Sequence, residues 1–464
     1  MEGKKNSSCR GKQLIFNALA HKPVERVPWV PFAGVHAGKL KGYTAKEILL
    51  DEDKLYESLM EVYKIYTPDG MPIVFDLQIE AEILGCKLLW AENNPPSVRK
   101  HPFAAVAGVP DEDKIPKKTD GRIPLVLNVM DRVKKSVGDD TALYGLICGP
   151  LTLASHLRGS EFFMDMFLAP DYVAQLMEFC KKVSLKMAEY YIDAGMDVIA
   201  VVDPLVSQVS PDSFATQLSF AFTEIFDYIR ERGVYSAFFV CGNATNQIKV
   251  MCDTHPDSIH VDENVDLYAA KDITDEYNIL IGGNIPLTTT MLFGNQQDNM
   301  KFVIDMLDKF KGRETNLIIS PGCDMPYDIP IENTVAVAQA ILHTDDCRGF
   351  VANYSSMVFD DLEVEIPDYE NLDKVLVELF TLDPDQCAAC TYMVRSVMDI
   401  YDEIKDKADY IVYRYNIKED IARTQKIGLS NLPTMCINGK PKFISLIPGK
   451  EELLKAIEEA EKNK

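Results

Sequence analysis

Basic residues are scarce in this chain of 464 residues, because 48 Lys and Arg stand against 71 Asp and Glu, which gives a net charge of −23. A protein that binds nucleic acid needs clustered Lys and Arg against the phosphates. Docking on an anionic membrane surface needs the same positive charges. The composition therefore argues against nucleic acid and against a membrane as partners.

Long apolar runs are also missing, since no stretch approaches the roughly 18 consecutive apolar residues that span a bilayer. The chain starts with basic residues, but no apolar segment follows them, so the start does not resemble a signal peptide. The chain has eleven cysteines at irregular spacing, an odd number that cannot all be paired in disulfides within one chain. In a chain of this length they indicate reduced thiols, a metal site or redox chemistry rather than a secreted disulfide framework. We expect a cytoplasmic protein.

Short apolar runs typical of strands alternate with longer amphipathic stretches, which is the pattern of repeated βα units. Eight such runs precede residue 325. They are Val27–Pro31, Pro72–Asp76, Ala142–Ile147, Asp197–Val202, Ser236–Val240, Ser258–Val261, Ile279–Gly282 and Leu317–Ser320. Eight units favour a closed (β/α)₈ TIM barrel over an open doubly wound sheet, so the fold class is α/β.

Polar residues and thiols follow most of these runs, and in such barrels the chemistry lies at the carboxyl ends of the strands. They include Asp76, Asp203, Cys241, Asp262, Asn284, Cys323 and Asp324. We interpret them as the mouth of a buried polar active site. The alternatives are ordinary: an acid after a strand often caps the next helix, and Asn284 either donates its amide to a substrate or fills a turn.

The composition changes after the eighth unit, where residues 359–371 are acidic and contain Pro367, which is typical of a linker. This predicts a barrel domain over residues 1–358 and a small α/β domain over residues 372–464. The second domain shows a strand, a helix that begins at a CxxC motif, a strand, a helix, a strand after Pro433, a hairpin and a final helix.

Cys387 and Cys390 place two thiols one turn apart at the start of a helix, where the helix dipole lowers a thiol pKa. The alternative is half of a structural zinc site, but no second CxxC or His pair follows at the required spacing. A proline that begins a strand, here Pro433, is what a thioredoxin-like fold places against the CxxC, usually after a cis peptide bond. The order of elements resembles thioredoxin, and we expect a redox pair.

Cys241 and Cys323 each lie in a turn beside glycine at the end of a barrel strand. A buried cysteine is most often a small apolar residue. Here both thiols are expected to face the pocket, where two thiolates with one or two further ligands make a zinc site.

Several segments resemble the uroporphyrinogen decarboxylase superfamily, above all Gly145–Gly159 and the opening segment Asn17–Pro28. Further segments are similar to its cobamide-dependent methyltransferase branch, which includes the methylcobamide:coenzyme M enzymes. They are Asp76–Glu82, Asp203–Ser207, Val240–Asn243, Val261–Asp266 and Pro321–Cys323. The resemblance covers roughly residues 10–345 and implies methyl transfer between a small methylated substrate or thiol and the corrinoid of a partner protein.

Two departures from the family pattern bear on the site. True decarboxylases carry an Arg-rich loop that clamps porphyrinogen carboxylates, and Val30–His36 contains no Arg. In the methyltransferases a His-x-Cys pair holds zinc, and Phe239 occupies the His position. Phe cannot bind a metal, so either zinc takes a replacement ligand or the metal is lost. The candidates for a replacement are Glu80, Asp76, Asp203 and His260. His260 shares a strand face with Asp262 by period-two alternation; the alternative is a packed histidine.

Together these patterns predict an enzyme, a cobamide-dependent methyltransferase, with zinc held by Cys241 and Cys323 and completed by Glu80 or His260. The predicted catalytic residues are Asp203, His156 and Asn284. Asp203 would complete the metal shell or protonate a leaving group, and His156 would hydrogen-bond near the substrate or only cap or support its helix. The redox group is Cys387, Cys390 and Pro433. Two rivals stay open: a lyase of the decarboxylase type acting on a small carboxylated substrate, and a non-catalytic redox adaptor that binds a corrinoid protein. Assembly into a homo-oligomer is also left open.

Overall fold

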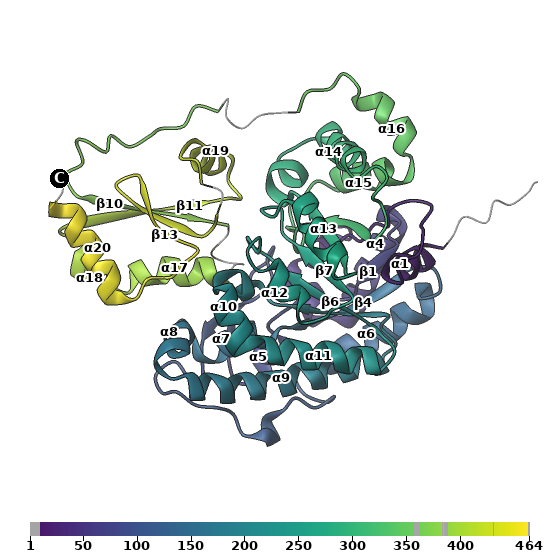
Figure 1. Cartoon of the computed structure of the whole chain (residues 1–464), viewed down its shortest axis with the longest axis horizontal. Helices are drawn as coiled ribbons and strands as arrows, with labels where there is room; N and C mark the ends of the chain where they lie inside the picture. The colour runs from purple at the N-terminus through teal and green to yellow at the C-terminus, as the bar shows by residue number, and fades with distance from the viewer. Residues whose placement is uncertain (1–9, 357–361, 383, 385–387, 430, 463–464) are drawn as a thin grey trace, which may run out of the picture.

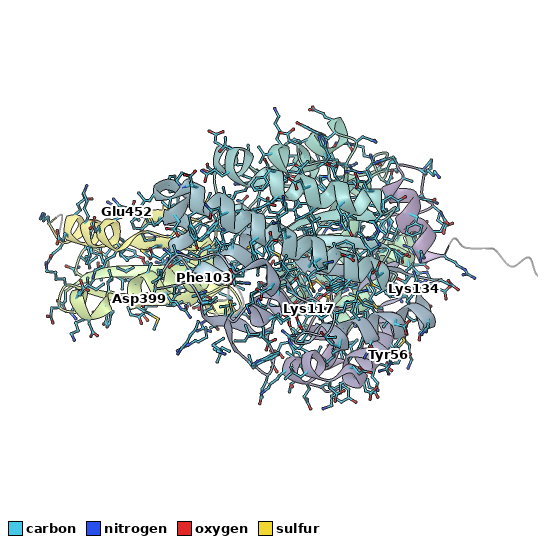
Figure 2. All side chains as sticks on the ribbon, turned by 90° about the horizontal axis from the view of Figure 1, so that it is seen from below. Tyr56, Phe103, Lys117, Lys134, Asp399 and Glu452 are labelled. Atoms are coloured by element: carbon cyan, nitrogen blue, oxygen red, sulfur yellow. A yellow bond between two sulfur atoms is a disulfide. The ribbon has the colours of Figure 1, made fainter. Side chains whose placement is uncertain are left out.

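The computed structural model describes residues 10–356, 362–382, 384, 388–429 and 431–462. They form two units, an N-terminal unit (residues 10–356) and a C-terminal unit (residues 372–462), which lie side by side (Figure 1). Figure 2 shows the smaller unit, with Asp399 and Glu452, extending from one end of the molecule, while Tyr56 and Lys134 lie on the far side. None of the described helices has the length and apolar character needed to cross a membrane.

Seven parallel strands form the sheet of the N-terminal unit, in the order β1-β4-β5-β6-β7-β8-β9. Their bounds are β1 Gly70–Pro72, β4 Ala142–Cys148, β5 Val198–Val202, β6 Tyr235–Val240, β7 Ser258–Val261, β8 Leu280–Ile285 and β9 Leu317–Pro321. This curved parallel sheet with helices outside is typical of TIM-like folds. A short hairpin, β2 Lys87–Leu89 and β3 Ser97–Lys100, lies outside the sheet and was not predicted.

The first predicted strand, Val27–Pro31, is reduced to a single bridge between Trp29 and Ile319. Pro28 and Pro31 have no N–H to donate, so a regular ladder cannot form there. The segment still joins the two sheet edges, because Val30 N–H donates to the Ile319 carbonyl at 3.0 Å and Asp69 N–H donates to the Trp29 carbonyl at 2.9 Å.

Helices cover the outside of this sheet. The longer ones are α1 Gly11–Leu19, α4 Glu52–Tyr66, α6 Ile123–Val137, α7 Pro150–Arg158, α8 Glu161–Leu168, α9 Pro170–Asp193, α11 Ser219–Glu231, α13 Leu267–Glu276, α14 Gln296–Lys309, α15 Ile331–Leu342 and α16 Thr344–Val351. The shorter ones are α2 His36–Lys39, α3 Ala45–Leu50, α5 Ile79–Ile83, η1 Glu112–Lys114, η2 Pro204–Gln208, α10 Pro211–Ser213, η3 Phe214–Leu218, α12 Ile248–Cys252 and η4 Leu287–Leu292.

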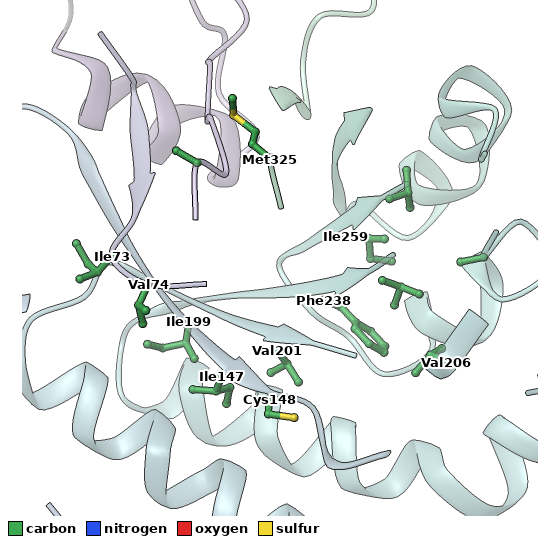
Figure 3. Close-up of a cluster of buried hydrophobic side chains, with 14 of the residues drawn as sticks. Ile73, Val74, Ile147, Cys148, Ile199, Val201, Val206, Phe238, Ile259 and Met325 are labelled. Carbon is green, nitrogen blue, oxygen red and sulfur yellow. The ribbon is translucent and has the colours of Figure 1, made fainter. Parts of the chain in front are cut away.

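The alternation of strand side chains divides the core into two layers. Ile147, Ile199 and Val201 lie between the strands and the outer helices (Figure 3). Side chains at alternate positions point inward instead. Ala200, between Ile199 and Val201, and Phe239, which follows Phe238, belong to a separate inner cluster. The inner layer is therefore packed with side chains, and the space available for a ligand lies above it, at the carboxyl ends of the strands.

The C-terminal unit is built on a second sheet of four strands in the order β11-β10-β12-β13, with β10 parallel to β11 and antiparallel to β12. Its elements are β10 Val375–Thr381, α17 Ala388–Met398, α18 Tyr401–Ile404, β11 Ala408–Arg414, α19 Lys418–Lys426, β12 Thr434–Ile437, β13 Lys440–Ile444 and α20 Lys450–Lys462. The Leu432–Pro433 peptide bond is cis, as expected. Of the predicted linker, residues 362–371 form no helix or strand, and residues 359–361 lie outside the described part.

Candidate functional site

A cavity of 540 Å³ lies between the carboxyl ends of the N-terminal strands and the C-terminal unit. From the N-terminal unit, the segments after β5, β6, β7 and β9 contribute Gln208, Cys241, Asp262, Glu263, Cys323 and Asp324. The opposite wall comes from the C-terminal unit, through Leu382, Ala389, Tyr415, Leu432 and Pro433. The site is therefore assembled from both units.

Cys241 and Cys323 meet in this cavity, where they form a disulfide with their Cα atoms 5.8 Å apart. The bond joins the end of β6 to the end of β9, two strands separated by β7 and β8 in the sheet. The structure thus brings the two cysteines of the sequence prediction together. A disulfide sulfur has no thiolate charge to offer a metal.

The described residues do not fit the expected zinc. No group of three or more His, Cys, Asp or Glu side chains among them is placed to hold a metal ion. Phe239, at the position of the missing His, packs in the inner layer with its ring 4.8 Å from that of Phe32 and 5.6 Å from that of His260. We therefore derive no step through zinc.

His260 lies in the same aromatic layer and does not line the cavity. Its ring meets that of Phe32 edge-on at 5.5 Å, and neither ring nitrogen has a hydrogen-bond partner among the described residues. Burial lowers the pKa of His260 to about 3, so the ring is neutral at pH 7.

Glu80, the other proposed metal ligand, lies in α5 behind the cavity wall. Its Oε1 accepts from the backbone N–H of Cys148 at 3.2 Å, and its Oε2 has no partner among the described residues. Burial raises the pKa of Glu80 to about 7. Asp76, two residues before Gln78, is instead paired with Arg122, and its Oδ1 accepts from the N–H of Gln78 at 2.8 Å.

Asp203 holds the start of α7. Its carboxylate accepts from the backbone N–H of Leu151 at 2.9 Å, from that of Thr152 at 3.1 Å and from the Thr152 hydroxyl at 2.6 Å. Burial raises the pKa of Asp203 to about 7, against these hydrogen bonds, which lower it. With its oxygens engaged and its side chain outside the cavity wall, Asp203 positions the helix that carries His156.

His156 does line the cavity, from the buried face of α7. The residue is 3% exposed, and its Nδ1 has no partner among the described residues. Burial lowers the pKa of His156 to about 3, so the imidazole is neutral. Its backbone carbonyl accepts from Nδ1 of His101 at 2.8 Å, which fixes the helix at this point.

Asn284 acts through the loop after β7 rather than on the cavity itself. Its Nδ2 donates to the carbonyls of Asp262 at 2.9 Å and Val265 at 2.7 Å. These bonds hold the segment that carries Glu263 into the cavity. Asn284 is therefore a positioning residue in this geometry.

Four acids line the cavity, Asp262, Glu263, Asp324 and the exposed Asp328, and the first three form what we call the acidic wall. Burial, and then repulsion by Asp262, raises the pKa of Glu263 to about 8. Burial also raises the pKa of Asp262, and it raises the pKa of Asp324 well above its usual range. Asp262 and Asp324 thus lie at one mouth, as the sequence predicts, and Glu263 follows Asp262 directly in the chain.

The C-terminal unit meets the N-terminal unit through Tyr392. Its buried hydroxyl lies 2.9 Å from the Ser155 hydroxyl of α7. The contact places the first turn of α17, with Ala389, and the cis-proline segment against the mouth. Cys390 is buried in α17, whereas Cys387 lies outside the described residues.

Comparison with known proteins follows the same division of the chain. The model of the family described as Uroporphyrinogen decarboxylase (URO-D) matches residues 10–343. The chain is 27% identical over 330 residues to the methylcobamide:CoM methyltransferase MtbA of Methanosarcina acetivorans, covering 69% of this chain and 94% of that protein. It is 25% identical over 354 residues to MtaA of Methanosarcina barkeri, covering 71% and 96%.

Other relatives and a solved structure complete the comparison. The uroporphyrinogen decarboxylase of a Synechococcus strain is 24% identical over 308 residues, covering 64% of this chain and 85% of that protein. A structure described as a methyltransferase from Methanosarcina mazei has a TM-score of 0.65 at 23% identity, covering 73% of this chain and 100% of that chain. At this identity, the structural likeness concerns the fold.

Proposed function

We propose that this chain, which belongs to the uroporphyrinogen decarboxylase family, is a cobamide-dependent methyltransferase. It moves a methyl group between a small methylated substrate or thiol and the corrinoid of a partner protein. The observation that carries the proposal is the small cavity at the strand ends, in a chain that spans 94% of a methylcobamide:CoM methyltransferase. We further propose that the N-terminal unit is a closed (β/α)₈ barrel and that the C-terminal unit is thioredoxin-like, with their boundary within residues 359–371.

The charge of the cavity favours this function over decarboxylation of a porphyrinogen. Among the described residues that line it, none is Lys or Arg. A polycarboxylate substrate would meet the acidic wall without a guanidinium to bind its carboxylates. The cavity therefore disfavours a large polyanion and suits a small substrate.

The mechanism that we propose uses the chain's own groups for binding and proton control. The partner's corrinoid supplies the methyl acceptor or donor when it reaches the cavity. Glu263, with its pKa near 8, is mostly protonated at pH 7 and partly ionised at pH 8. The protonated form can give its proton to a leaving group that gains charge, and the ionised form can take a proton or face a positive charge. His156 offers a neutral nitrogen, and Asn284 holds the loop of Glu263 in place.

Methyl transfer is tested with the full chain, free methylcobalamin as the probe and a panel of thiols, following the visible spectrum of the cobalamin. We expect methyl loss from methylcobalamin that depends on the chain and is slowed at least about tenfold by Glu263→Gln, whose amide cannot take up the proton that the attacking thiol releases. Asp345→Asn is the matched control, an exposed acid in α16. Carbon dioxide release without corrinoid would support the lyase instead. Binding of a corrinoid protein that survives Cys241→Ser, with no transfer from any donor, would support the adaptor.

We also propose a second activity, thiol–disulfide exchange between the two units, favoured by the shared cavity. Cys241 and Cys323 line the same space as Ala389, Leu432 and Pro433 of the C-terminal unit. In this exchange a thiolate of the CxxC motif attacks the Cys241–Cys323 bond, and the second CxxC thiol then displaces the mixed disulfide. Two electrons and two protons pass to the barrel cysteines, and the CxxC becomes the disulfide, which an external dithiol resets.

The exchange has a covalent signature. In Cys390→Ser the second step is blocked, so we expect a trapped mixed disulfide between Cys387 and Cys241 or Cys323, identified by peptide mapping under non-reducing conditions. Cys436→Ser, which removes another buried thiol of the same unit, is the control and should trap nothing. Absence of the cross-link in Cys390→Ser, with equal rates of reduction of the barrel disulfide in the parent and this variant, would contradict the exchange.

A further inference from the structure

The cavity has an unbalanced charge. Asp262, Glu263 and Asp324 line it, and no Lys or Arg among the described residues joins them. Buried carboxylates are normally paired with a cation or kept neutral by a proton. Without a cationic side chain, each of these acids is either protonated or paired with a positive charge that a ligand brings.

A second and independent observation comes from side-chain atoms at the cavity that have no hydrogen-bond partner among the described residues. The Nδ1 of His156 is one of them, on a residue that is 3% exposed. The others are the Oδ1 of Asp324 and the Oε1 atoms of Gln78 and Gln208. Oxygens of this kind accept hydrogen bonds or attract positive charge, so the unsatisfied groups favour a donor or a cation over an anion.

Aromatic rings complete the wall. Phe75, Phe293, Tyr327 and Tyr415 line the same cavity. The faces of such rings attract organic cations, and apolar surface suits the methyl groups of a methylated nitrogen. Acids and aromatic faces together are the chemistry that binds a methylated ammonium group.

We infer that this cavity binds a small methylated organic cation as the methyl donor, an inference that rests on the proposed methyl transfer. In the transfer the C–N bond breaks with its electron pair left on nitrogen, which leaves as a neutral amine. The methyl group joins the reduced cobalt of the partner's corrinoid, and the cobalt supplies the electron pair of the new bond. The charge that attracts the substrate is thus absent from the product amine as it forms, which favours its release.

The decisive measurement compares two ligands of almost equal shape and different charge, choline and 3,3-dimethylbutan-1-ol, by calorimetry on the full chain without corrinoid. We expect choline to bind at least about tenfold more tightly, since a desolvated cation beside acids and rings gains about 1.4 kcal/mol or more. The anionic thiol 2-mercaptoethanesulfonate should bind more weakly than choline. Equal binding of choline and its neutral analogue would overturn the inference.

Variants locate the effect. Measured at about pH 9, where Glu263 is ionised, Glu263→Gln and Asp324→Asn, each checked for unchanged melting temperature, should reduce the preference for choline over the neutral alcohol about tenfold, whereas the exposed Asp345→Asn should not. Both cavity variants retaining the full preference would refute this assignment. The use of two variants keeps the test valid if one of them fails to fold.

The pH dependence gives a further readout. Glu263 faces two titratable groups, Asp262 beside it and Tyr415 from the C-terminal unit, and it accepts from the N–H of Leu287. A cation binds the ionised carboxylate, so choline affinity should rise with pH through the pKa of Glu263 near 8. The rise should be smaller in Glu263→Gln.

The two proposals fail separately. Choline binding without any methyl transfer in the presence of corrinoid would remove the methyltransferase and leave the cation site standing. Methyl transfer to or from a neutral or anionic compound, in a chain that does not distinguish choline from its neutral analogue, would remove only the cation site.

Discussion

The pair between Arg122 and Asp76 should be the costliest ion pair to break near the site, because both side chains are out of water. The side chain of Asp76 is 0% exposed and that of Arg122 is 9% exposed. Arg122→Gln leaves the Asp76 carboxylate buried without its cation, which costs about 3–5 kcal/mol in comparable cases. The substitution also removes the ion pair between Arg122 Nε and Glu82 Oε2 at 2.8 Å, and the stacking of the guanidinium over the ring of Trp90.

The expected shift in melting temperature follows from the size of the unit. At about 2.1 cal/mol/K per residue, unfolding of the roughly 350 residues of the N-terminal unit has an entropy of about 0.7 kcal/mol/K. A loss of 3–5 kcal/mol then lowers the melting temperature by about 4–7 °C. Differential scanning calorimetry measures this directly, with Arg132→Gln as the control.

Arg132 belongs to a surface pair with Asp53 at 2.8 Å, in which the arginine is 33% exposed. Such pairs contribute about 0–1 kcal/mol, so the control should move the melting temperature by about 1 °C or less. Equal shifts in Arg122→Gln and Arg132→Gln would refute the reasoning. The double variant Asp76→Asn/Arg122→Gln should recover part of the loss, since it removes the unpaired charge. If the double variant is as unstable as Arg122→Gln alone, the loss of stability comes from the contact with Glu82 or from packing, and not from the unpaired Asp76.

Other predictions follow from single contacts. Glu80→Gln should stabilise the protein at pH 8 but not at pH 4.5. Folding raises the pKa of Glu80 to about 7, so the folded protein loses roughly 3 kcal/mol of stability as pH rises from the unfolded pKa to that value. A Gln side chain does not titrate, so the variant avoids this loss. Urea titrations of parent and variant at both pH values measure the free energies of unfolding. The same difference between parent and variant at pH 8 and pH 4.5 would contradict the prediction. Asn284→Ala leaves the carbonyls of Asp262 and Val265 without their donor and should cost about 2 kcal/mol in the same titrations. Tyr392→Phe removes the hydroxyl that meets Ser155 and should lower hydrogen-exchange protection in α7 by about 1 kcal/mol. Unchanged protection would show that this hydroxyl does not stabilise α7.

Much of the barrel could be predicted because its signal is local and periodic. Seven of the eight apolar runs are close to the observed strands, although the second run, Pro72–Asp76, overlaps β1 only at Pro72. The alternation of side chains places Phe239 and Cys241 on the inner face of β6, as the inner cluster shows. In the C-terminal unit, the predicted hairpin is formed by β12 and β13, with Asn438 and Gly439 at its turn.

The details of the site depend on contacts that no local pattern encodes. Asp203 was expected to act in catalysis, yet its oxygens are taken up by the start of α7, whose packing brings Leu151 and Thr152 to them. Asp76 meets Arg122 across 46 positions of sequence. Tyr415 reaches the cavity only because of how the two units pack. A strand-end acid in the sequence can therefore be a cap, an ion-pair partner or a cavity wall.

The two activities proposed here are coupled through charge. Reduction of the Cys241–Cys323 bond replaces an uncharged disulfide by two thiols in a cavity that already holds Asp262, Glu263 and Asp324. Where a thiolate and an ionised acid stand together in a buried site, their like charges repel. A bound cation offsets that repulsion, so it binds the reduced cavity more tightly than the oxidised one whenever a thiolate is present. By reciprocity, the same cation shifts the barrel cysteines toward the reduced state, to the extent of its difference in affinity.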